Sequence, residues 1–470
     1  MLENDFLLNN EIAKYLYHQI AQKLPIIDYH NHLNPLAIAN NKKFKNITEL
    51  WIYDDQYKHR LMRINGVGEN YITGDAPDYE KFLAWMETLP KTIGNPVYQW
   101  SQLEISYIFG ADINLLKDDP LEIWQRCNQK LGENGFGVID ILKKWNVAFL
   151  STSDDLLDGL ETHQQASADQ NHQFLVKPSL RADAVLAFET PTFTNWLTKF
   201  TNISGIEITN LDSYLQAINI RLDYFQKSGC LSSDHALDSG FIFKLPTKTI
   251  AEKLFAKLLN DGHLTNDEIV ELQSYLLQFL GIEYGKRKLV MQLHIGAQRT
   301  TSTRLKKIAA KYGGFAAIGN PLDIESICMF LDTLEKESTL PKTILYTLNA
   351  VDNERIGTLT GSFTEEGIRG KVQFGPAWWF NDHYDGFVKQ LTALASYGML
   401  STFIGMTSDS RSFLSLSRHY YFRRILCSLI GEWVEKGLLP DDKQVLQVLV
   451  EDICCNNAIA YINVEKKELV

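Results

Sequence analysis

Short apolar runs that end in polar residues recur at eight places along the chain. Several of these runs are continuously apolar rather than alternating, which is typical of parallel β-strands buried on both faces. Helical patterns lie between most of them, and SLSRHYYFRRILCSLIGEWVEKG, after the last run, is one example. The runs predict strands at residues 24–32, 146–155, 173–181, 230–238, 288–299, 342–350, 371–379 and 402–411.

Eight strand–helix units in one chain predict an α/β fold, a (β/α)8 barrel of the TIM type. The longest spacer, residues 35–140, separates the first two expected strands and carries Trp, Tyr and Leu at helical spacing. We therefore expect a helical insertion after the first strand. Residues 1–470 are expected to form a single barrel domain that contains this insertion at residues 35–140.

Charge and cysteine usage argue against several classes of protein. A net charge of −11, without any Lys/Arg-rich run, argues against a nucleic-acid partner. The six cysteines are scattered without CxxC spacing, so neither a zinc cluster nor a disulfide scaffold is expected. The N-terminus lacks the apolar core of a signal peptide, and no run of about 18 apolar residues is present to span a bilayer. These patterns predict a cytoplasmic protein without a membrane partner.

The stretch LPIIDYHNHL places two histidines two positions apart at the end of the first apolar run. In a β-strand, residues i and i+2 point to the same side, so His30 and His32 are expected to share one face. Two neutral imidazoles side by side suit a divalent metal, although two ligands are too few to close a site. The alternative is a pair of hydrogen-bonded histidines near a strand end.

The eighth run, GMTSDSRSF, supplies the strongest partner for these histidines. Asp409 and Arg411 share one face if the backbone is extended, and the first and eighth strands are neighbours in a closed barrel. Asp409 is then within reach of a metal held by His30 and His32. Such a site keeps coordination positions open, as catalytic sites do. The alternative is a local salt bridge between Asp409 and Arg411 at the barrel rim.

Other strand ends carry residues with more than one interpretation. His235 and His294 are each a further ligand, a substrate contact or a core histidine. Arg181 and Arg299, with the arginine of the eighth run, either form a positive pocket for a carboxylate or make structural bridges. Tyr57, on the insertion, either packs or takes part in catalysis. The chain lacks a Gly-rich phosphate loop and a GxSxG elbow, which argues against phosphoryl transfer, dinucleotide binding and serine hydrolysis.

Seven segments of the sequence are particularly specific: DYHNHL, YKHRLMRINGV, TSDD, MQLHIGAQR, LPKTILYTLN, QFGPAWWFND and GMTSDSRSFLSLSRHYYFRRIL. Taken together, they resemble the glucuronate isomerase (uronate isomerase) family, a branch of the metal-dependent amidohydrolase superfamily, over essentially the whole chain. The resemblance implies a distorted barrel. It also implies aldose–ketose isomerisation, through an enediol, of D-glucuronate to D-fructuronate and of D-galacturonate to D-tagaturonate.

Matched position by position, the resemblance implies metal ligands at His30, His32 and Asp409. The ion is one divalent metal, usually zinc, and the open site also suits manganese or cobalt. Arg411 and Tyr57 are implied to act in catalysis or to orient the substrate. The isomerisation also requires a carboxylate that takes the proton from C2 and returns it to C1, and Asp409 is the expected base. The implied pocket residues are Arg181, His294, Arg299 and Trp378.

Departures from the family pattern leave two rival functions open. Gln56 stands where the family commonly has a histidine, and Asn320 replaces a common acid. A hydrolase of the same superfamily, of the lactonase or deaminase type, needs a fuller ligand set, and the sixth run, TILYTLNA, has no histidine. The other rival is a non-catalytic sugar-acid binder. The expected partner is a uronic acid, and a homo-oligomer is left open.

Overall fold

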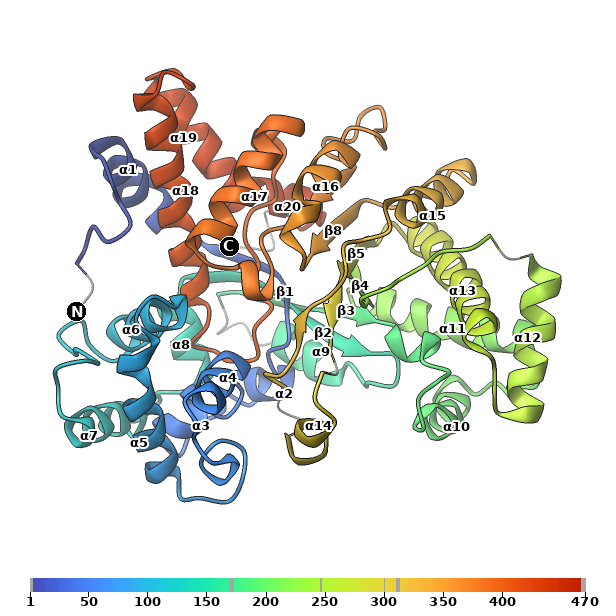
Figure 1. The fold of residues 1–470 in the computed structure, drawn as a ribbon, viewed down its shortest axis with the longest axis horizontal. Coiled ribbons are helices and arrows are strands. Elements are labelled where there is room, and N and C mark those ends of the chain that lie inside the picture. The colour runs from blue at the N-terminus through green and yellow to red at the C-terminus, as the bar shows by residue number, and fades with distance from the viewer. Residues whose placement is uncertain (1–2, 169–172, 246, 300, 310–312, 466–470) are drawn as a thin grey trace.

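The computed structural model describes residues 3–168, 173–245, 247–299, 301–309 and 313–465. A curled sheet of seven parallel strands lies at its centre, with helices around it (Figure 1), in the order β1-β2-β3-β4-β5-β8-β9. Each neighbour in this order is also the next main strand along the chain, as in a (β/α)8 barrel. The strands are β1 (Ile26–Asn31), β2 (Val147–Asp155), β3 (Leu175–Arg181), β4 (Ser232–Leu237), β5 (Val290–Ile295), β8 (Thr343–Thr347) and β9 (Val372–Phe374).

These seven strands confirm the first seven predicted runs. Every residue of β1, β5, β8 and β9 is buried, as expected of parallel strands that are covered on both faces. The fifth run is longer than the strand that it forms. It turns at Gly296 and continues as a short strand, β6 (Ala297–Gln298), which pairs in antiparallel fashion with β7 (Ala317–Ile318).

The eighth predicted strand, residues 402–411, is wrong. Residues 403–410 are extended or bent without a ladder, and Gly405 and Asp409 have φ values of 75° and 45°. A Cβ at Gly405 would lie 2.0 Å from the carbonyl oxygen of Ile453, so this bend requires glycine. We call residues 403–410 the closing segment, because it lies along β1. Asp409 N–H donates to the His30 carbonyl at 3.1 Å, and His32 N–H donates to the Ser410 carbonyl at 2.9 Å.

The predicted helical insertion is confirmed as a group of helices between β1 and β2. Capping residues mark where several of them begin: Asn46, Asp55, Asn95 and Asp119 each accept backbone N–H groups of the following turn. The exact limits of the insertion, and the single-domain organisation, stay predictions. The helices are α2 (Pro35–Ala39), α3 (Ile47–Trp51), α4 (Gln56–Ile64), α5 (Asp78–Thr88), α6 (Pro96–Ile108), α7 (Pro120–Leu131) and α8 (Val138–Lys144).

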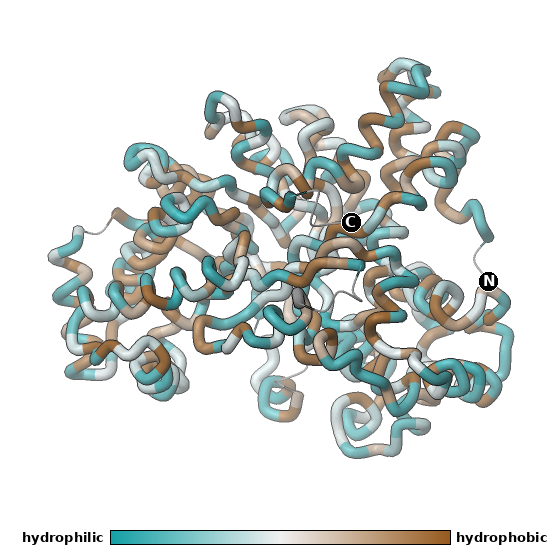
Figure 2. Tube along the Cα trace, turned by 180° about the vertical axis from the view of Figure 1, so that it is seen from behind, coloured by the Kyte–Doolittle hydropathy of each residue, from teal (hydrophilic) through white to brown (hydrophobic). Residues whose placement is uncertain are grey.

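The remaining helices connect or follow the other strands and cover the outside of the sheet (Figure 1). Along these helices hydrophilic and hydrophobic residues alternate within a turn or two (Figure 2), as expected of helices with one face on the core. They are α1 (Glu11–Tyr15), α9 (Glu161–Ala168), α10 (Phe193–Ser204), α11 (Leu211–Lys227), α12 (Lys248–Asp261), α13 (Asn266–Arg287), α14 (Thr303–Ala309), α15 (Ile324–Lys336), α16 (Asn353–Leu359), α17 (Tyr384–Tyr397), α18 (Ser417–Glu435), α19 (Lys443–Glu451) and α20 (Asn457–Tyr461).

Helix α18 differs from the others, because every residue from Ser417 to Gly431 is buried. It packs against α1, α6 and α17, so it lies between the helical insertion and the last part of the barrel. A helix buried on all sides must satisfy its polar side chains internally. In its first turn, Arg418 donates to the Ser408 carbonyl of the closing segment, and the His419 ring lies 3.3 Å from the Asp28 carboxylate. Within the described residues, no helix combines the length and the apolar character needed to cross a bilayer.

Candidate metal centre and active site

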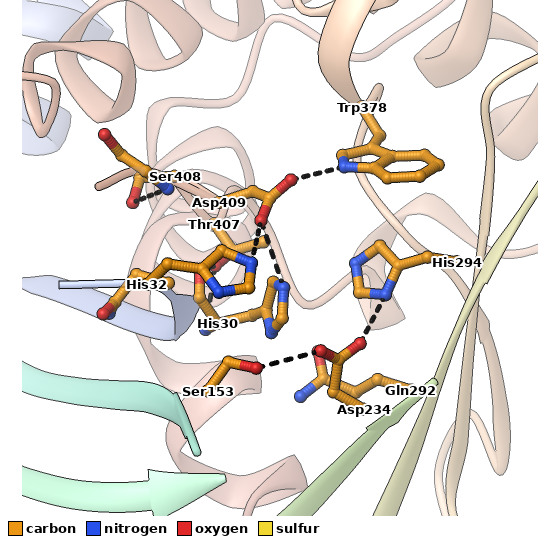
Figure 3. A network of polar contacts seen from close by, with 12 residues as sticks. His30, His32, Ser153, Asp234, Gln292, His294, Trp378, Thr407, Ser408 and Asp409 are labelled. Carbon is orange, nitrogen blue, oxygen red and sulfur yellow. Dashed lines mark hydrogen bonds and ion pairs between the residues drawn. The ribbon is translucent and has the colours of Figure 1, made fainter. Parts of the chain in front are cut away.

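His30, His32 and Asp409 converge at the carboxyl end of β1 (Figure 3). Asp409 Oδ1 lies 3.2 Å from His30 Nε2 and 3.0 Å from His32 Nε2. The two imidazoles share one side of the chain, as their spacing predicted. His30 is fully buried, whereas the His32 side chain is 18% exposed, so the group is open on the side of His32. The three donor atoms lie within 4.8 Å of one another, and this set is able to hold a metal ion.

The second oxygen of Asp409 is held by two indole groups. Trp378 Nε1 donates to Asp409 Oδ2 at 2.5 Å, and Trp379 Nε1 donates to the same atom at 2.7 Å. Burial raises the pKa of Asp409, but hydrogen bonds from His30 and His32 outweigh it and hold this pKa well below its usual value. The carboxylate is therefore ionised at neutral pH.

Asp28 holds the backbone of the closing segment in place. Its Oδ1 accepts from Ser408 N–H at 2.6 Å and from Thr407 Oγ1 at 2.8 Å, and its Oδ2 accepts from Ser408 Oγ at 2.6 Å. His419 Nε2, on α18, lies 3.3 Å from the same carboxylate. Sequence reasoning missed this residue, because its partners on the closing segment and on α18 are more than 370 positions away along the chain.

Asp234 forms a second group with His30 and His294, and their donor atoms also lie within 4.8 Å of one another. Its Oδ1 is 2.8 Å from His294 Nδ1 (Figure 3), and its Oδ2 accepts from Ser153 Oγ at 3.1 Å. Asp234 was not predicted, because His235, which follows it on β4, is the more conspicuous candidate ligand in the sequence. Adjacent residues of a strand face opposite sides, so only one of the two reaches the inside of the barrel.

His235 is the core histidine among its three interpretations. It is fully buried on the outer side of β4, and its Nε2 lies 2.8 Å from the hydroxyl of Tyr284 on α13. His294 faces the opposite way, into the site. Strand register pairs His294 with Tyr346 of β8, and their rings stack with centroids 4.2 Å apart. Burial lowers the pKa of His294, and its Nε2 has no hydrogen-bond partner among the described residues.

Arg181 is occupied by acidic partners. The register of β3 and β4 sets Arg181 opposite Asp234, and Arg181 Nη1 donates to Asp234 Oδ2 at 3.1 Å. Arg181 Nε and Nη2 contact Asp183 Oδ2 at 2.9 and 2.8 Å. Each of its three nitrogens thus contacts a carboxylate, and the geometry fits a structural bridge better than a free anion clamp.

Arg299 and Arg411 make fewer contacts with carboxylates than Arg181 does. Arg299 contacts Asp238 Oδ1 through Nε at 2.7 Å, and its guanidinium lies 5.2 Å from the Trp379 ring. Arg411 is exposed and, among the described residues, takes part in no ion pair. The expectation that Asp409 and Arg411 share a face through an extended backbone is wrong, because Asp409 has a φ of 45°. A salt bridge between these two residues is also absent from the described ion pairs.

One cavity of about 180 Å³ brings most of the predicted site residues together. Gln56, the departure from the family pattern, reaches this cavity from α4. Three arginines and the donor group face one space, so the cavity combines positive charge with an open metal-binding set. Its lining residues are His30, His32, Gln56, Arg181, His294, Arg299, Trp378, Trp379, Asp409 and Arg411.

Tyr57 lines a smaller space next to this cavity, which it shares with His294, Trp378 and Asp409. Its hydroxyl donates to Asp382 Oδ2 at 2.8 Å. Burial and the neighbouring Asp382 carboxylate raise the pKa of Tyr57 well above its usual value, so its hydroxyl keeps its proton at neutral pH. Sequence reasoning did not identify Asp382, which is 325 positions away from Tyr57 and is marked by no local pattern.

The strand order and the donor set define an α/β barrel protein with a His/Asp group able to hold a divalent metal ion. The model of the family described as Glucuronate isomerase matches residues 1–462. The chain belongs to the glucuronate isomerase family. This membership confirms the resemblance inferred from the motifs. It also confirms the prediction that the chain is an isomerase enzyme.

Individual relatives match over nearly the whole length. The chain is 48% identical over 463 residues to a uronate isomerase of Caldanaerobacter subterraneus, with 98% of this chain and 99% of the relative covered. It is 44% identical over 467 residues to a uronate isomerase of Bacillus licheniformis, with 99% and 98% covered. The crystal structure of uronate isomerase from Thermotoga maritima superposes with a TM-score of 0.92 at 31% identity, over 98% of this chain and 99% of that chain.

Proposed function

We propose that this protein is a uronate isomerase that interconverts D-glucuronate with D-fructuronate and D-galacturonate with D-tagaturonate. The observation that carries the proposal is the single cavity in which an open His/Asp donor group faces arginine side chains. The donor group suits the carbonyl end of an open-chain uronate, and the guanidinium groups suit its carboxylate. Incubation of the purified protein with D-glucuronate, with ketose formation as the readout, tests this activity.

The residues present fit a divalent metal ion. His30 Nε2 and His32 Nε2 both point at one oxygen of Asp409, and no cationic side chain belongs to the group. We propose zinc as the ion, with manganese and cobalt as alternatives. Held by His30, His32 and Asp409, such an ion would supply Lewis acidity and stabilise negative charge on a substrate oxygen. Elemental analysis should find about one ion per chain, and none after His30 and His32 are both replaced by Ala.

Isomerisation requires that a proton leave C2 and return to C1. Asp409 is the one carboxylate among the described residues that line the cavity, and it is ionised at neutral pH, so we assign it the role of base. The indole N–H groups of Trp378 and Trp379 fix its Oδ2 and so orient the carboxylate. We assign to Arg411, which lines the same cavity and has no acidic partner among the described residues, the role of stabilising the enediolate.

The clamp for the substrate carboxylate is better supplied by Arg299 than by Arg181. Arg299 uses only its Nε for Asp238, which leaves its terminal nitrogens for the substrate. Arg181 spends all three nitrogens on Asp183 and Asp234. Its role is then to hold Asp234, which in turn orients His294. This assignment refines the expectation that both arginines bind the carboxylate.

The hydrolase alternative is less well supported. A hydrolase of this superfamily would need a histidine on the sixth strand, whereas β8 presents Tyr346 there, stacked on His294. A sugar-acid binder without activity is separated from the isomerase by the ketose assay itself.

We also propose a cytoplasmic location, which cell fractionation tests. Light scattering of the purified protein measures whether it forms a homo-oligomer.

A further inference from the structure

A buried acid, Asp382, stands directly behind Tyr57 and has no place in the mechanism above. The acid follows η8 (Trp379–Asn381), and its side chain is 6% exposed. Asp382 Oδ2 accepts the hydroxyl proton of Tyr57 at 2.8 Å, so the Tyr57 oxygen keeps its lone pairs for another donor. Both residues line the small cavity that also includes Asp409. This small cavity adjoins the larger one, because Trp378, Trp379 and Asp409 line both.

Arg418, in the first turn of α18, contacts both Tyr57 and Asp382. Its guanidinium lies 4.4 Å from the Tyr57 ring and 4.7 Å from the Trp100 ring. Its Nη1 donates to the Ser408 carbonyl at 3.0 Å and lies 3.6 Å from Asp382 Oδ2. One cation therefore connects the helical insertion, the acid and the residue before Asp409. Such a contact fixes the position of Tyr57 relative to the donor group.

The charged and titratable groups around Asp382 come from three elements. Arg418 and Tyr421 face it from α18, Tyr57 faces it from α4, and Asp409 acts on it from the closing segment. Burial raises the pKa of Asp382 to about 7, and the Arg418 guanidinium opposes this rise. The acid is thus suited to take up and release a proton near neutral pH.

We propose that Asp382 is a positioning residue that acts through Tyr57 as the end of a two-residue proton relay, an inference that rests on the proposed isomerase function. An aldose becomes a ketose only if the C2 hydroxyl loses its proton and the C1 oxygen gains one. The C2 hydroxyl gives its proton to Tyr57 Oη while Tyr57 gives its own proton to Asp382 Oδ2. One O–H bond of the substrate breaks, one O–H bond forms on Asp382, and the negative charge moves from Asp382 to the substrate oxygen.

The second half of the relay restores the resting state. Asp382 returns its proton to Tyr57, and Tyr57 passes a proton to the C1 oxygen, while Asp409 moves the carbon-bound proton from C2 to C1. No oxidant or further reactant is needed. Arg418 keeps Tyr57 and Asp382 in contact throughout, because it touches both.

The test uses the metal-loaded full-length protein with D-glucuronate and four variants: Asp382→Asn, Asp382→Glu, Tyr57→Phe and the double variant Asp382→Asn/Tyr57→Phe. Asp382→Asn should lower kcat by about 10²- to 10³-fold and change KM by less than about 3-fold. The double variant should be no slower than the worse single variant by more than about 3-fold, because both changes break the same relay. Asp382→Glu should recover part of the lost kcat.

The pH profile adds a readout that a packing role would not move. The acidic limb of kcat/KM with an apparent pKa near 7 should be present in the native protein and absent from Asp382→Asn. A matched control is Asp352→Asn, which changes another buried acid, bonded to Arg355 at 2.9 Å and outside the cavity. This control should retain native kcat and the native limb.

Three outcomes would overturn the relay. They are a kcat of Asp382→Asn within about 3-fold of native, losses that multiply in the double variant, or an acidic limb that persists in Asp382→Asn. If Asp382→Asn does not fold, Tyr57→Phe decides, because it must lose the same limb. A native protein that makes no ketose at all would instead refute the proposed function, and the two failures are therefore distinct.

Discussion

The carboxylate of Asp28 accepts a hydrogen bond from the backbone N–H of Ser408 at 2.6 Å, across 380 positions of the chain. This contact joins the first strand to the closing segment one residue before Asp409. Because Asp28 also accepts from the Ser408 and Thr407 hydroxyls, it fixes the backbone from which the Asp409 side chain projects. The metal-binding group thus depends on an acid that is not part of it.

Replacement of Asp28 by Asn should loosen this backbone and weaken metal binding by about 10- to 100-fold. It should also lower the free energy of unfolding by about 2–4 kcal/mol, since several buried donors lose their charged acceptor. Elemental analysis after dialysis against a weak chelator, and urea unfolding, measure the two effects. Asp154→Asn is the control, because Asp154 is buried and bonded to Thr152 on β2 without lining the cavity. Equal metal retention by both variants would contradict the role of Asp28.

Arg299→Ala should lower kcat/KM for D-glucuronate by about 10²- to 10³-fold, because the substrate carboxylate loses a bidentate partner. The already slow turnover of D-glucose, which has no carboxylate, should change little. Steady-state kinetics with both sugars provide the measurement, with Arg126→Ala as a control whose arginine is exposed and paired with Asp112 at 2.7 Å. An unchanged preference for glucuronate over glucose would rule Arg299 out as the clamp.

Asp409→Asn should retain some metal, since an amide oxygen remains, but lose isomerisation by about 10³- to 10⁴-fold. In the native protein, turnover in D₂O should place any incorporated deuterium at C1 in one stereochemical position. Glucuronate deuterated at C2 should show a primary isotope effect on kcat. NMR of the ketose and competitive rate measurements report these results, and near-native turnover by Asp409→Asn would mean that another group carries the proton.

Stability should depend on pH through Asp382. Its pKa is about 7 in the folded protein, against about 3.9 in an unfolded chain, so the folded state holds a proton that the unfolded state loses between these values. Stability therefore falls as the pH rises from about 4 to 7. The free energy of unfolding of Asp382→Asn minus that of the native protein should rise across this window and level off above it. Urea titrations at several pH values measure the difference, and a flat difference would contradict the raised pKa.

The first seven strands and the convergence of His30 and His32 could be predicted from sequence, because both follow from the local repeat of a buried strand. Asp409 was found for a partly incorrect reason. Its predicted position next to β1 is confirmed, but its backbone is left-handed rather than extended. Asp28 holds the residue before it through a contact that no local pattern encodes. The pairing of Tyr57 with Asp382 lies equally beyond local pattern, because it depends on how the insertion packs on α18.

The closing segment has one more consequence. The seven strands are joined by ladders, yet the joint between the closing segment and β1 consists of separate bonds made by Tyr29, His30, His32, Asp28 and their partners. His30, His32 and Asp409 thus contribute both to these bonds and to the metal-binding group. A substitution at residues 403–410 that changes the catalytic rate also changes the contacts that close the barrel. Catalytic rate and folding stability are therefore coupled at these residues.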